Sequence, residues 1–478
     1  MIVHKFGGTS VGDAERIRRA AGLVLEDGGP GVVVVSAMAG VTDLLGGLVA
    51  LHRAGDSGGI VSGLGGLQER HLLAARGIAD ADDTADLEAR VTEIFQRLEG
   101  ILLSPTAATG AADPLLHARL TDEVSSAGED LSAELMAAAL RRAGVAARVV
   151  DARTLIRTDA SFGHAVPMEE VIRSLVKEHL APLPGEGVVP VVQGFVGATV
   201  NGVTTTLGRG GSDFTAAILA SALGSREVFI WTDVDGLLSA DPDTVDGAIL
   251  LEEVGFEEAV ELAYFGAKVI HSRAAKWAVS RGVSIKIRNS FSPLGPETVI
   301  RWDRRGSAEV AAVAYKPGVI LIKVRAHPTS LPYGFLAQVF DVLARHRLPV
   351  DLVATSHSST AFTIDENEEV GRVSLELGEI AEVEVVRHLA TVTVVGHGLM
   401  DEPGVNGRVF EAVGSTPVHL ISQASDVSVS FLVAESDAEA VVQRVHRQLI
   451  APRRAARSGR SLDGRPTGAK AQAKEAGS

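Results

Sequence analysis

Cysteine is absent from this chain of 478 residues. Disulfide bonds and thiolate metal sites are therefore excluded, and nothing in the composition requires an oxidising compartment. Long hydrophobic runs are missing as well. Apolar stretches such as Val32–Val35 and Val188–Val192 are far shorter than the roughly 20 residues that cross a bilayer. We therefore expect no membrane partner.

Positive charge is also scarce, because the formal net charge is −15. A protein this acidic is not expected to bind nucleic acid. The strand-like start of the chain leads straight into a candidate site, so we expect no secretion signal and a cytoplasmic location. The length and the 46% hydrophobic content are enough for several cores, and we expect about three domains.

The first ten residues, Met1-Ile-Val-His-Lys-Phe-Gly-Gly-Thr-Ser10, form a candidate phosphate-binding motif. The glycine pair lacks Cβ atoms, so its N–H groups can approach a polyanion closely. The lysine adds a compact cation, and the start of the following helix would point its positive end at the same anion. A turn that needs glycine only for its geometry is the alternative. The candidate ligands are Lys5, Gly7, Gly8, Thr9 and Ser10.

Three further motifs follow in order along the chain. They read Thr204-Thr-Thr-Leu-Gly-Arg-Gly-Gly-Ser-Asp213, Ile230-Trp-Thr-Asp-Val-Asp-Gly236 with Ser239-Ala-Asp-Pro242, and Tyr264-Phe-Gly-Ala-Lys-Val-Ile-His271. Together with the first motif, this order resembles the aspartate kinases of the amino-acid kinase superfamily. The resemblance extends from Met1 to about Ile450.

The part of the chain before residue 300 alternates β-like runs with Ala-rich helical stretches. This pattern predicts an α/β fold with a mainly parallel open sheet and helices on both faces, and ligands belong at the carboxyl ends of its strands. The segment from Leu44 to Leu120 reads as a helical excursion that caps the site or contacts another subunit. The predicted strands are Ile2–Lys5, Val32–Ser36, Arg148–Val150, Val188–Val192, Val228–Thr232 and Val283–Ile287.

The pattern after Gly306 changes to short strands with single helices. It resembles paired regulatory domains of the ACT type, which are α+β sandwiches. The resemblance implies a catalytic domain, a first ACT-like domain inserted in a second, and a basic tail that we expect to be disordered. The predicted boundaries are 1–302, then 317–386 for the inserted domain, 308–316 with 388–450 for the second, and 451–478 for the tail.

The resemblance implies transfer of the γ-phosphoryl group of ATP to the side-chain carboxylate of L-aspartate, which gives 4-phospho-L-aspartate. A carboxylate is already ionised at neutral pH, so catalysis needs positioning and charge stabilisation but no general base. The implied catalytic residues are Lys5, Asp213 and Lys268. The implied nucleotide contacts are those of the first motif with Thr232, Asp233, Leu238, Asp243 and Lys268. The implied aspartate contacts are Ser36, Thr42, Glu129, Phe195, Arg209, Ser212 and Asp213.

Several of these residues have a structural alternative. Arg209 has the planar fork that binds a carboxylate, and Glu129 would bind the ammonium group, although taken alone it is an ordinary helix-start glutamate. Phe195 is either a pocket wall or core, and Lys268 is either a phosphate contact or a surface lysine. Asp213 either orients Lys5 or the substrate ammonium, or simply caps a helix.

Two positions depart from the family pattern at the nucleotide. Leu238 replaces a common aromatic residue, and Asp243 replaces a common basic residue. Nucleotide stacking and a phosphate contact are affected, so we expect weaker binding of ATP. Mg²⁺ is expected to bridge the phosphates, and no dedicated metal-ligand cluster stands out.

The first ACT-like domain resembles the lysine pocket of lysine-inhibited members, with Asp351 as the partner of the effector ammonium group. Lysine is the first expectation, threonine the second, and dimerisation without inhibition the third. A homodimer or homotetramer is implied. The candidate effector residues are Thr329, Pro332, Phe335, Leu336, Val350, Asp351 and Ser356.

Two other functions stay open at this point. One is a kinase for another amino acid or a nucleotide, and the other is a non-catalytic amino-acid sensor that has kept the fold. A fused homoserine dehydrogenase is not expected, because no dinucleotide fingerprint is found. The branch of amino-acid synthesis that would use the product, towards lysine, threonine or ectoine, is also open.

Overall fold

The computed structural model divides the chain into two units, which we describe separately. Unit 1 comprises residues 1–238 and 250–306, and unit 2 comprises residues 239–249 and 307–478. The structure describes residues 1–26, 31–104, 113–265, 270–302, 309–327, 334–367, 369–401 and 403–451.

The main sheet of unit 1 has eight strands in the order β3-β5-β2-β1-β8-β10-β11-β9. The strands from β3 to β10 run parallel, β11 is antiparallel to β10, and β9 is parallel to β11. A second, three-stranded sheet has the order β4-β6-β7. The strands of the main sheet are β1 (Val3–Phe6), β2 (Val32–Val35), β3 (Ala147–Val150), β5 (Val189–Gln193), β8 (Glu227–Thr232), β9 (Glu253–Gly255), β10 (Ser284–Asn289) and β11 (Thr298–Arg301); those of the small sheet are β4 (Arg157–Thr158), β6 (Val196–Thr199) and β7 (Thr204–Thr206).

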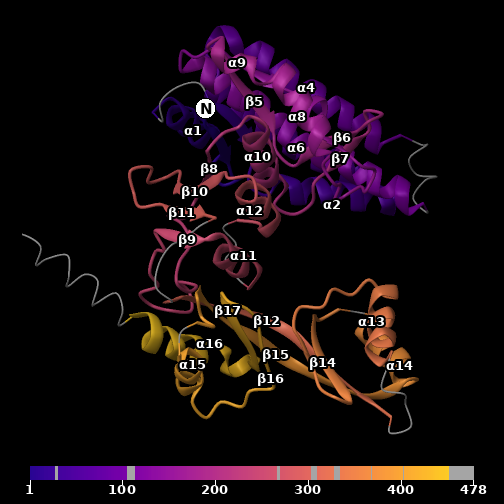
Figure 1. The fold of residues 1–478 in the computed structure, drawn as a ribbon. Coiled ribbons are helices and arrows are strands. Elements are labelled where there is room, and N and C mark those ends of the chain that lie inside the picture. The colour runs from indigo at the N-terminus through magenta and orange to yellow at the C-terminus, as the bar shows by residue number, and fades with distance from the viewer. Residues whose placement is uncertain are drawn as a thin grey trace, which may run out of the picture. The chain divides into compact units, whose positions relative to one another are not determined.

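Helices cover both faces of the main sheet (Figure 1). The residues of β2 show this directly, because Val33 and Val35 belong to one core cluster and Val32 and Val34 belong to the other. A strand buried on both faces has no polar side, which explains its unbroken run of valines. The helices are α1 (Ala14–Glu26), α2 (Val41–Ala54), α3 (Ser57–Ile78), α4 (Ala81–Leu102), α6 (Pro114–Arg142), α7 (Ala152–Leu155), α8 (Glu169–His179), α9 (Pro182–Gly185), α10 (Gly211–Ala222), α11 (Phe256–Phe265) and α12 (Ser272–Val279).

The fold class predicted from the sequence is confirmed for this unit. The segment predicted as a helical excursion forms α2, α3, α4 and the start of α6, and these helices pack with α1 in one core cluster. None of the helices in the part of the chain that the structure describes is both long and apolar enough to cross a membrane.

Unit 2 is built on one antiparallel sheet in the order β13-β14-β12-β15-β17-β16. Its two central strands, β12 (Glu309–Ala326) and β15 (Ala381–His397), pair over nearly their whole length. Each of these two long strands is therefore part of both α+β halves of unit 2. The shorter strands are β13 (Val353–Thr355), β14 (Ser359–Asp365), β16 (Leu420–Ser425) and β17 (Ser428–Ala434).

Each half of unit 2 has its own helices and its own core cluster. Helices α13 (Phe335–Arg345) and α14 (Val370–Gly378) pack on the first half, around Phe362. The second half has Phe431 in its core. Its helices are α15 (Val405–Val413), α16 (Glu435–Val445) and the π-helical turn η1 (His446–Ile450).

The second half also contains residues 239–249, which the sequence pattern assigns to the catalytic domain. Ala240 and Val245 are buried in its core, and Val313 N donates a hydrogen bond to Ser239 O at 2.8 Å. The apolar side chains of this segment explain why it packs here. The predicted disordered tail lies outside the described residues, apart from Ala451.

Candidate active site

Two loops meet at the carboxyl ends of neighbouring strands β1 and β2. Ala39 N donates to Gly8 O at 3.1 Å. A Cβ atom on Gly8 would lie 2.8 Å from Ala37 O, so only glycine allows the loops to come this close. Gly7 N donates to Trp231 O at the end of β8, at 3.0 Å. The glycine pair therefore holds the first loop against both neighbouring strands.

Lys5 and Asp213 form a buried ion pair at this edge of the sheet. Lys5 Nζ lies 2.6 Å from Asp213 Oδ1, and each side chain is 11% exposed. Asp213 is the third residue of α10, whose N-cap is Gly210. The helix-cap alternative for Asp213 is therefore wrong. The structure favours the alternative in which this carboxylate orients Lys5.

The loop before α10 presents Arg209 to solvent between two glycines. Gly208 and Gly210 have φ angles of +78° and +65°, which L side chains rarely adopt. A Cβ atom on Gly210 would also lie 2.2 Å from the His271 Cβ atom. The pKa of His271 is lowered, chiefly by burial. The loop around Arg209 therefore requires glycine on both sides, and Arg209 itself is exposed.

Glu129 is a fully buried carboxyl group in α6. Its Oε1 accepts a hydrogen bond from Ala37 N at 3.1 Å, while its Oε2 has no hydrogen-bond partner among the described residues. Burial raises the pKa of Glu129 to about 8, and neighbouring Asp130 also raises it, whereas the Ala37 bond and Lys5 lower it. A buried, unsatisfied carboxyl oxygen is costly. Such a group fits a site that receives a cation.

Asp130 lies beside Glu129 but is held by arginines. Arg153 reaches both of its oxygens, at 2.9 and 3.1 Å, and Arg97 adds a contact at 2.7 Å. These pairs offset the negative charge next to Glu129. Sequence reasoning missed Arg153, although it follows the carboxyl end of β3, where a site residue belongs.

The remaining predicted aspartate contacts lie around these groups. Ser36 follows β2 directly, Thr42 is exposed in the first turn of α2, and Ser212 lies at the start of α10. Phe195 has a φ of +68°, and a Cβ atom on Gly211 would lie 2.6 Å from its ring. The half-buried phenyl ring therefore lies against the start of α10, where it packs and also forms a wall.

The predicted nucleotide contacts lie in different parts of the structure. Thr232 ends β8 and exposed Asp233 follows it, with a 3.1 Å hydrogen bond from the hydroxyl to the carboxylate. Leu238 is half-buried and forms an isolated antiparallel β-bridge with Leu250. Asp243 belongs to the segment that is part of unit 2. Lys268 lies outside the described residues.

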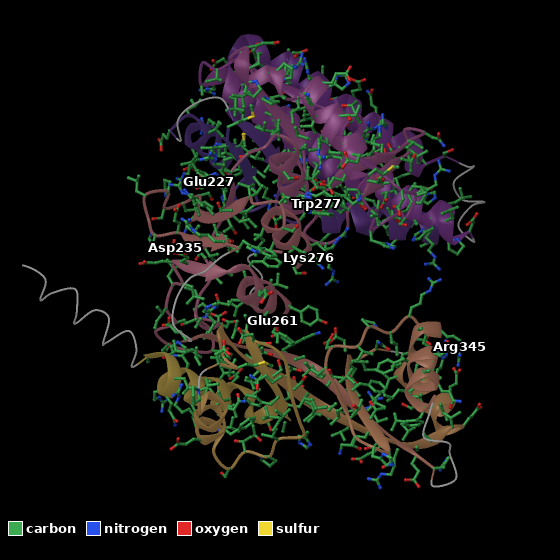
Figure 2. The ribbon with its side chains drawn as sticks, in the orientation of Figure 1. Glu227, Asp235, Glu261, Lys276, Trp277 and Arg345 are labelled. Atoms are coloured by element: carbon green, nitrogen blue, oxygen red, sulfur yellow. The ribbon has the colours of Figure 1, made fainter. Side chains whose placement is uncertain are left out.

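The hydroxyl of Ser10 is used within the fold. Its Oγ lies 2.8 Å from Ser290 Oγ and 3.3 Å from Trp231 O. Ser10 is buried, so it joins three strand ends and does not face the loop surface. The adjoining Asp235, labelled in Figure 2, accepts a hydrogen bond from Asn289 at 2.8 Å. Thr9 remains the half-exposed hydroxyl of the motif.

The predicted effector residues lie in unit 2. Thr329 and Pro332 fall outside the described residues, and Phe335 and Leu336 open α13. The carboxylate of Asp351 already holds Lys316 Nζ at 2.9 Å. Ser356 and Val350 flank this region, and the Ser356 hydroxyl lies 2.7 Å from that of Ser359.

No group of three or more His, Asp or Glu side chains that could hold a metal ion occurs among the residues described here.

The chain is similar to known proteins over nearly its whole length. Residues 1–289 match the amino acid kinase family, and residues 392–449 match an ACT domain. Lysine-sensitive aspartokinase 3 of Escherichia coli (strain K12) is 36% identical, over 94% of this chain and 99% of that protein. Chloroplastic aspartokinase 3 of Arabidopsis thaliana is 35% identical, over 93% of this chain and 80% of that protein.

Two solved structures of E. coli aspartokinase III share the fold at 34% identity, and both comparisons cover 94% of this chain and 99% of the other. The complex with aspartate and ADP has a TM-score of 0.82, and the complex with lysine and aspartate has a TM-score of 0.77. The chain therefore belongs to the amino acid kinase family. Within this family it is one of the aspartokinases, and the predicted family membership is confirmed.

Proposed function

We propose that the edge of the sheet around Lys5 transfers the γ-phosphoryl group of ATP to the β-carboxylate of L-aspartate. A carboxylate oxygen of aspartate attacks the γ-phosphorus, the bond from phosphorus to the β,γ-bridging oxygen breaks, and ADP leaves. The observation that carries this proposal is the buried ion pair between Lys5 and Asp213, 2.6 Å apart, where the glycine loops meet.

The two loops suit the two substrates. Gly7, Gly8 and Thr9 would hold the phosphates with N–H and hydroxyl donors, and Lys5 would stabilise charge on the transferring group. Asp213 fixes the Lys5 ammonium group in place. Thr232, Asp233 and Leu238 would contact the nucleoside, and Asp243 and Lys268 remain predicted nucleotide contacts.

Aspartate would be bound by charge on both sides. Arg209 would take the α-carboxylate, and Glu129, with its unpartnered Oε2, would take the ammonium group. Ser36 and Thr42 would contact the β-carboxylate. The half-buried ring of Phe195 and the start of α10 at Ser212 would close the pocket.

Mg²⁺ is the ion we propose to accompany ATP. It usually keeps several waters and is held through substrate phosphates with one or two carboxylates. Asp233 is an exposed hard oxygen donor directly after β8, so a carboxylate is present for an ion that arrives with the nucleotide. The ion would neutralise charge on the phosphates.

A coupled assay of ADP formation tests the reaction. The full chain is supplied with Mg-ATP and, in turn, with L-aspartate, L-glutamate, N-acetylglutamate and a nucleoside monophosphate. We expect turnover with aspartate and trapping of the product by hydroxylamine, which reacts with acyl phosphates. Turnover with another acceptor but not with aspartate would overturn the proposal.

We also propose that the first half of unit 2 binds an amino-acid effector, with lysine ahead of threonine. In the structure, Asp351 has an internal ammonium partner in Lys316, so an effector would compete with that partner. Activity is measured at sub-saturating aspartate with either amino acid at roughly 10 mM, above ordinary small-ligand dissociation constants of about 1 mM or tighter. Inhibition that Asp351→Ala leaves unchanged, or no inhibition at all, would contradict this site.

Several broader expectations stay predictions. These are assembly into a dimer or tetramer through the ACT-like halves, a cytoplasmic location, and use of the product in the synthesis of amino acids such as lysine or threonine.

A further inference from the structure

Arg70 reaches from α3 to both loops of the active site. Its Nη2 atom donates to Ala39 O at 2.9 Å and to Gly12 O at 3.3 Å. Ala39 lies in the loop after β2, and Gly12 lies in the loop after β1. One guanidinium group therefore joins two loops that belong to different strands.

This contact adds an attachment further along the first loop. Two backbone hydrogen bonds also join the loops, from Ser36 N to Phe6 O and from Ala39 N to Gly8 O, each at 3.1 Å. Both involve the start of the first loop, whereas Arg70 ties the distant Gly12 to Ala39. Hydrogen bonds from a charged donor are also stronger than neutral ones. Arg70 thus restrains the angle between the two loops.

That angle matters for the proposed reaction. The loop after β1 would hold the ATP phosphates, and the loop after β2 would hold the aspartate, partly through the bond from Ala37 N to Glu129 Oε1. Phosphoryl transfer requires the attacking oxygen and the phosphorus to be in line, with reacting atoms about 3–3.5 Å apart. A small shift between the loops moves one substrate relative to the other.

We propose that Arg70 is a positioning residue, which sets the approach of the aspartate carboxylate to the γ-phosphate without touching either substrate. This inference rests on the proposed assignment of the two loops to the two substrates. It predicts that loss of Arg70 lowers kcat and leaves both KM values nearly unchanged, because each loop still binds its own substrate.

The fold gives Arg70 little role in anchoring α3. The next residue, His71, is fully buried, bonds Leu67 O through Nδ1 at 2.7 Å and packs on Phe95. Ile60, Leu64 and Ala75 bury the same face of the helix. Variants at Arg70 are therefore expected to fold.

The experiment compares Arg70→Met and Arg70→Lys with Arg76→Met in the full chain. Arg76 lies on the same helix and pairs with Glu88 at 2.6 Å, so it controls for the loss of one arginine contact of α3. For each variant, kcat and both KM values are measured, and calorimetry gives the number of ADP sites per chain. Each assay is repeated with guanidinium ion at concentrations far below denaturing ones.

We expect Arg70→Met to lower kcat by about 10- to 100-fold, the size of effect that misplacing substrates by about 1 Å produces. The KM values should change by less than about threefold, and the number of ADP sites should not change. Guanidinium ion should restore part of the activity, Arg70→Lys should lie between Arg70→Met and the wild type, and Arg76→Met should match the wild type.

Other results would overturn the inference. These are wild-type kcat in Arg70→Met, an equal loss in Arg76→Met, or a loss that equals the fall in ADP sites and is not rescued by guanidinium ion. Lys5→Ala, measured in parallel, separates the two proposals. Full activity in Lys5→Ala refutes the loop assignment itself, whereas inactive Lys5→Ala with fully active Arg70→Met refutes only the role of Arg70.

Discussion

Two clusters of ionisable groups, one in each unit, differ in how deeply they are buried. Unit 1 buries the ion pair of Lys5 and Asp213, and it buries Glu129 with an oxygen that has no partner among the described residues. In unit 2, Arg345 and His346 share Glu376, with side-chain exposures of 52%, 19% and 33% (Figure 2 labels Arg345). Buried charge carries a desolvation cost, whereas exposed pairs cost and contribute little. We propose that substrates bind where this cost arises, so changes of charge should have large effects at the cluster of unit 1 and small ones at the exposed cluster around Glu376.

The largest effect is expected at Lys5. Lys5→Ala should lower kcat at least about 100-fold, because one preorganised contact to developing charge has that size of effect. It also leaves Asp213 buried without its ion-pair partner, so the number of ADP sites per chain must be measured alongside the rate. Near-normal turnover in a folded Lys5→Ala protein would contradict the proposed site.

Arg209 should affect one substrate only. Arg209→Ala should raise the KM for aspartate by about 10- to 100-fold, the size expected for loss of hydrogen bonds to a charged group, and leave the KM for ATP within about threefold. Arg209→Lys should fall between, since an ammonium group cannot replace the planar fork. Arg226→Ala, at another exposed arginine of unit 1, is the matched control. Equal changes in both KM values would move Arg209 to the phosphate side.

The contrast between the units also explains what the sequence could and could not predict. The sequence predicts the six parallel strands of the main sheet, because short apolar runs such as Val32–Val35 are typical of strands buried on both faces. It does not predict the short strands β4, β6, β7, β9 and β11. The length of β12 was not found, because Pro317-Gly318 reads as a break. The strand continues through it with a register shift between Lys316 and Val319, where Gly318 has a φ of +70°. His388, with a φ of +57°, marks the matching irregularity in β15.

The site was predictable to a similar degree. The family resemblance predicts Lys5, Glu129 and Asp213 in one site, and the structure brings them to one edge of the sheet. The sequence does not predict Arg70 or Arg153 as site residues. Their contacts join residues that are 23 to 58 positions apart, and no local sequence pattern relates such residues. Such contacts depend on how the helices pack on the sheet, and this packing cannot be inferred from the pattern of a single sequence.

Glu129 gives a third test, through pH. Burial raises its pKa to about 8, so without substrate the carboxyl group is mostly protonated at pH 7. Binding of the aspartate ammonium group requires the ionised form and should release a proton. The KM for aspartate should therefore fall about eightfold between pH 7 and pH 8.5. Calorimetry in buffers of different ionisation enthalpy should show the released proton.

Glu129→Gln is the control for this effect. It should raise the KM for aspartate and abolish its pH dependence over the same range. The same raised pKa predicts that the contribution of Glu129 to stability, in the substrate-free protein, is complete below about pH 4.5 and is lost as the pH rises through about 8. A KM for aspartate that stays flat from pH 7 to 8.5 in the wild type would argue against Glu129 as the ammonium ligand.

The smallest effect is expected at His346, the titratable group of the exposed cluster in unit 2. Its ring nitrogens lie 2.7 Å from Glu376 and 3.2 Å from Glu369, and these carboxylates raise its pKa above the ordinary 6.5. A raised pKa means that the stabilising charge is present below about pH 6.5 and is lost as the pH rises through the folded-state pKa. Because the groups are exposed, the midpoint of thermal unfolding of unit 2 should fall by no more than about 2 °C over that range. His346→Gln should remove the fall, while His357→Gln, at an exposed histidine of the same unit, should keep it. A fall several times larger would mean that unit 2, like unit 1, depends on its charged groups, and the contrast between the units would fail.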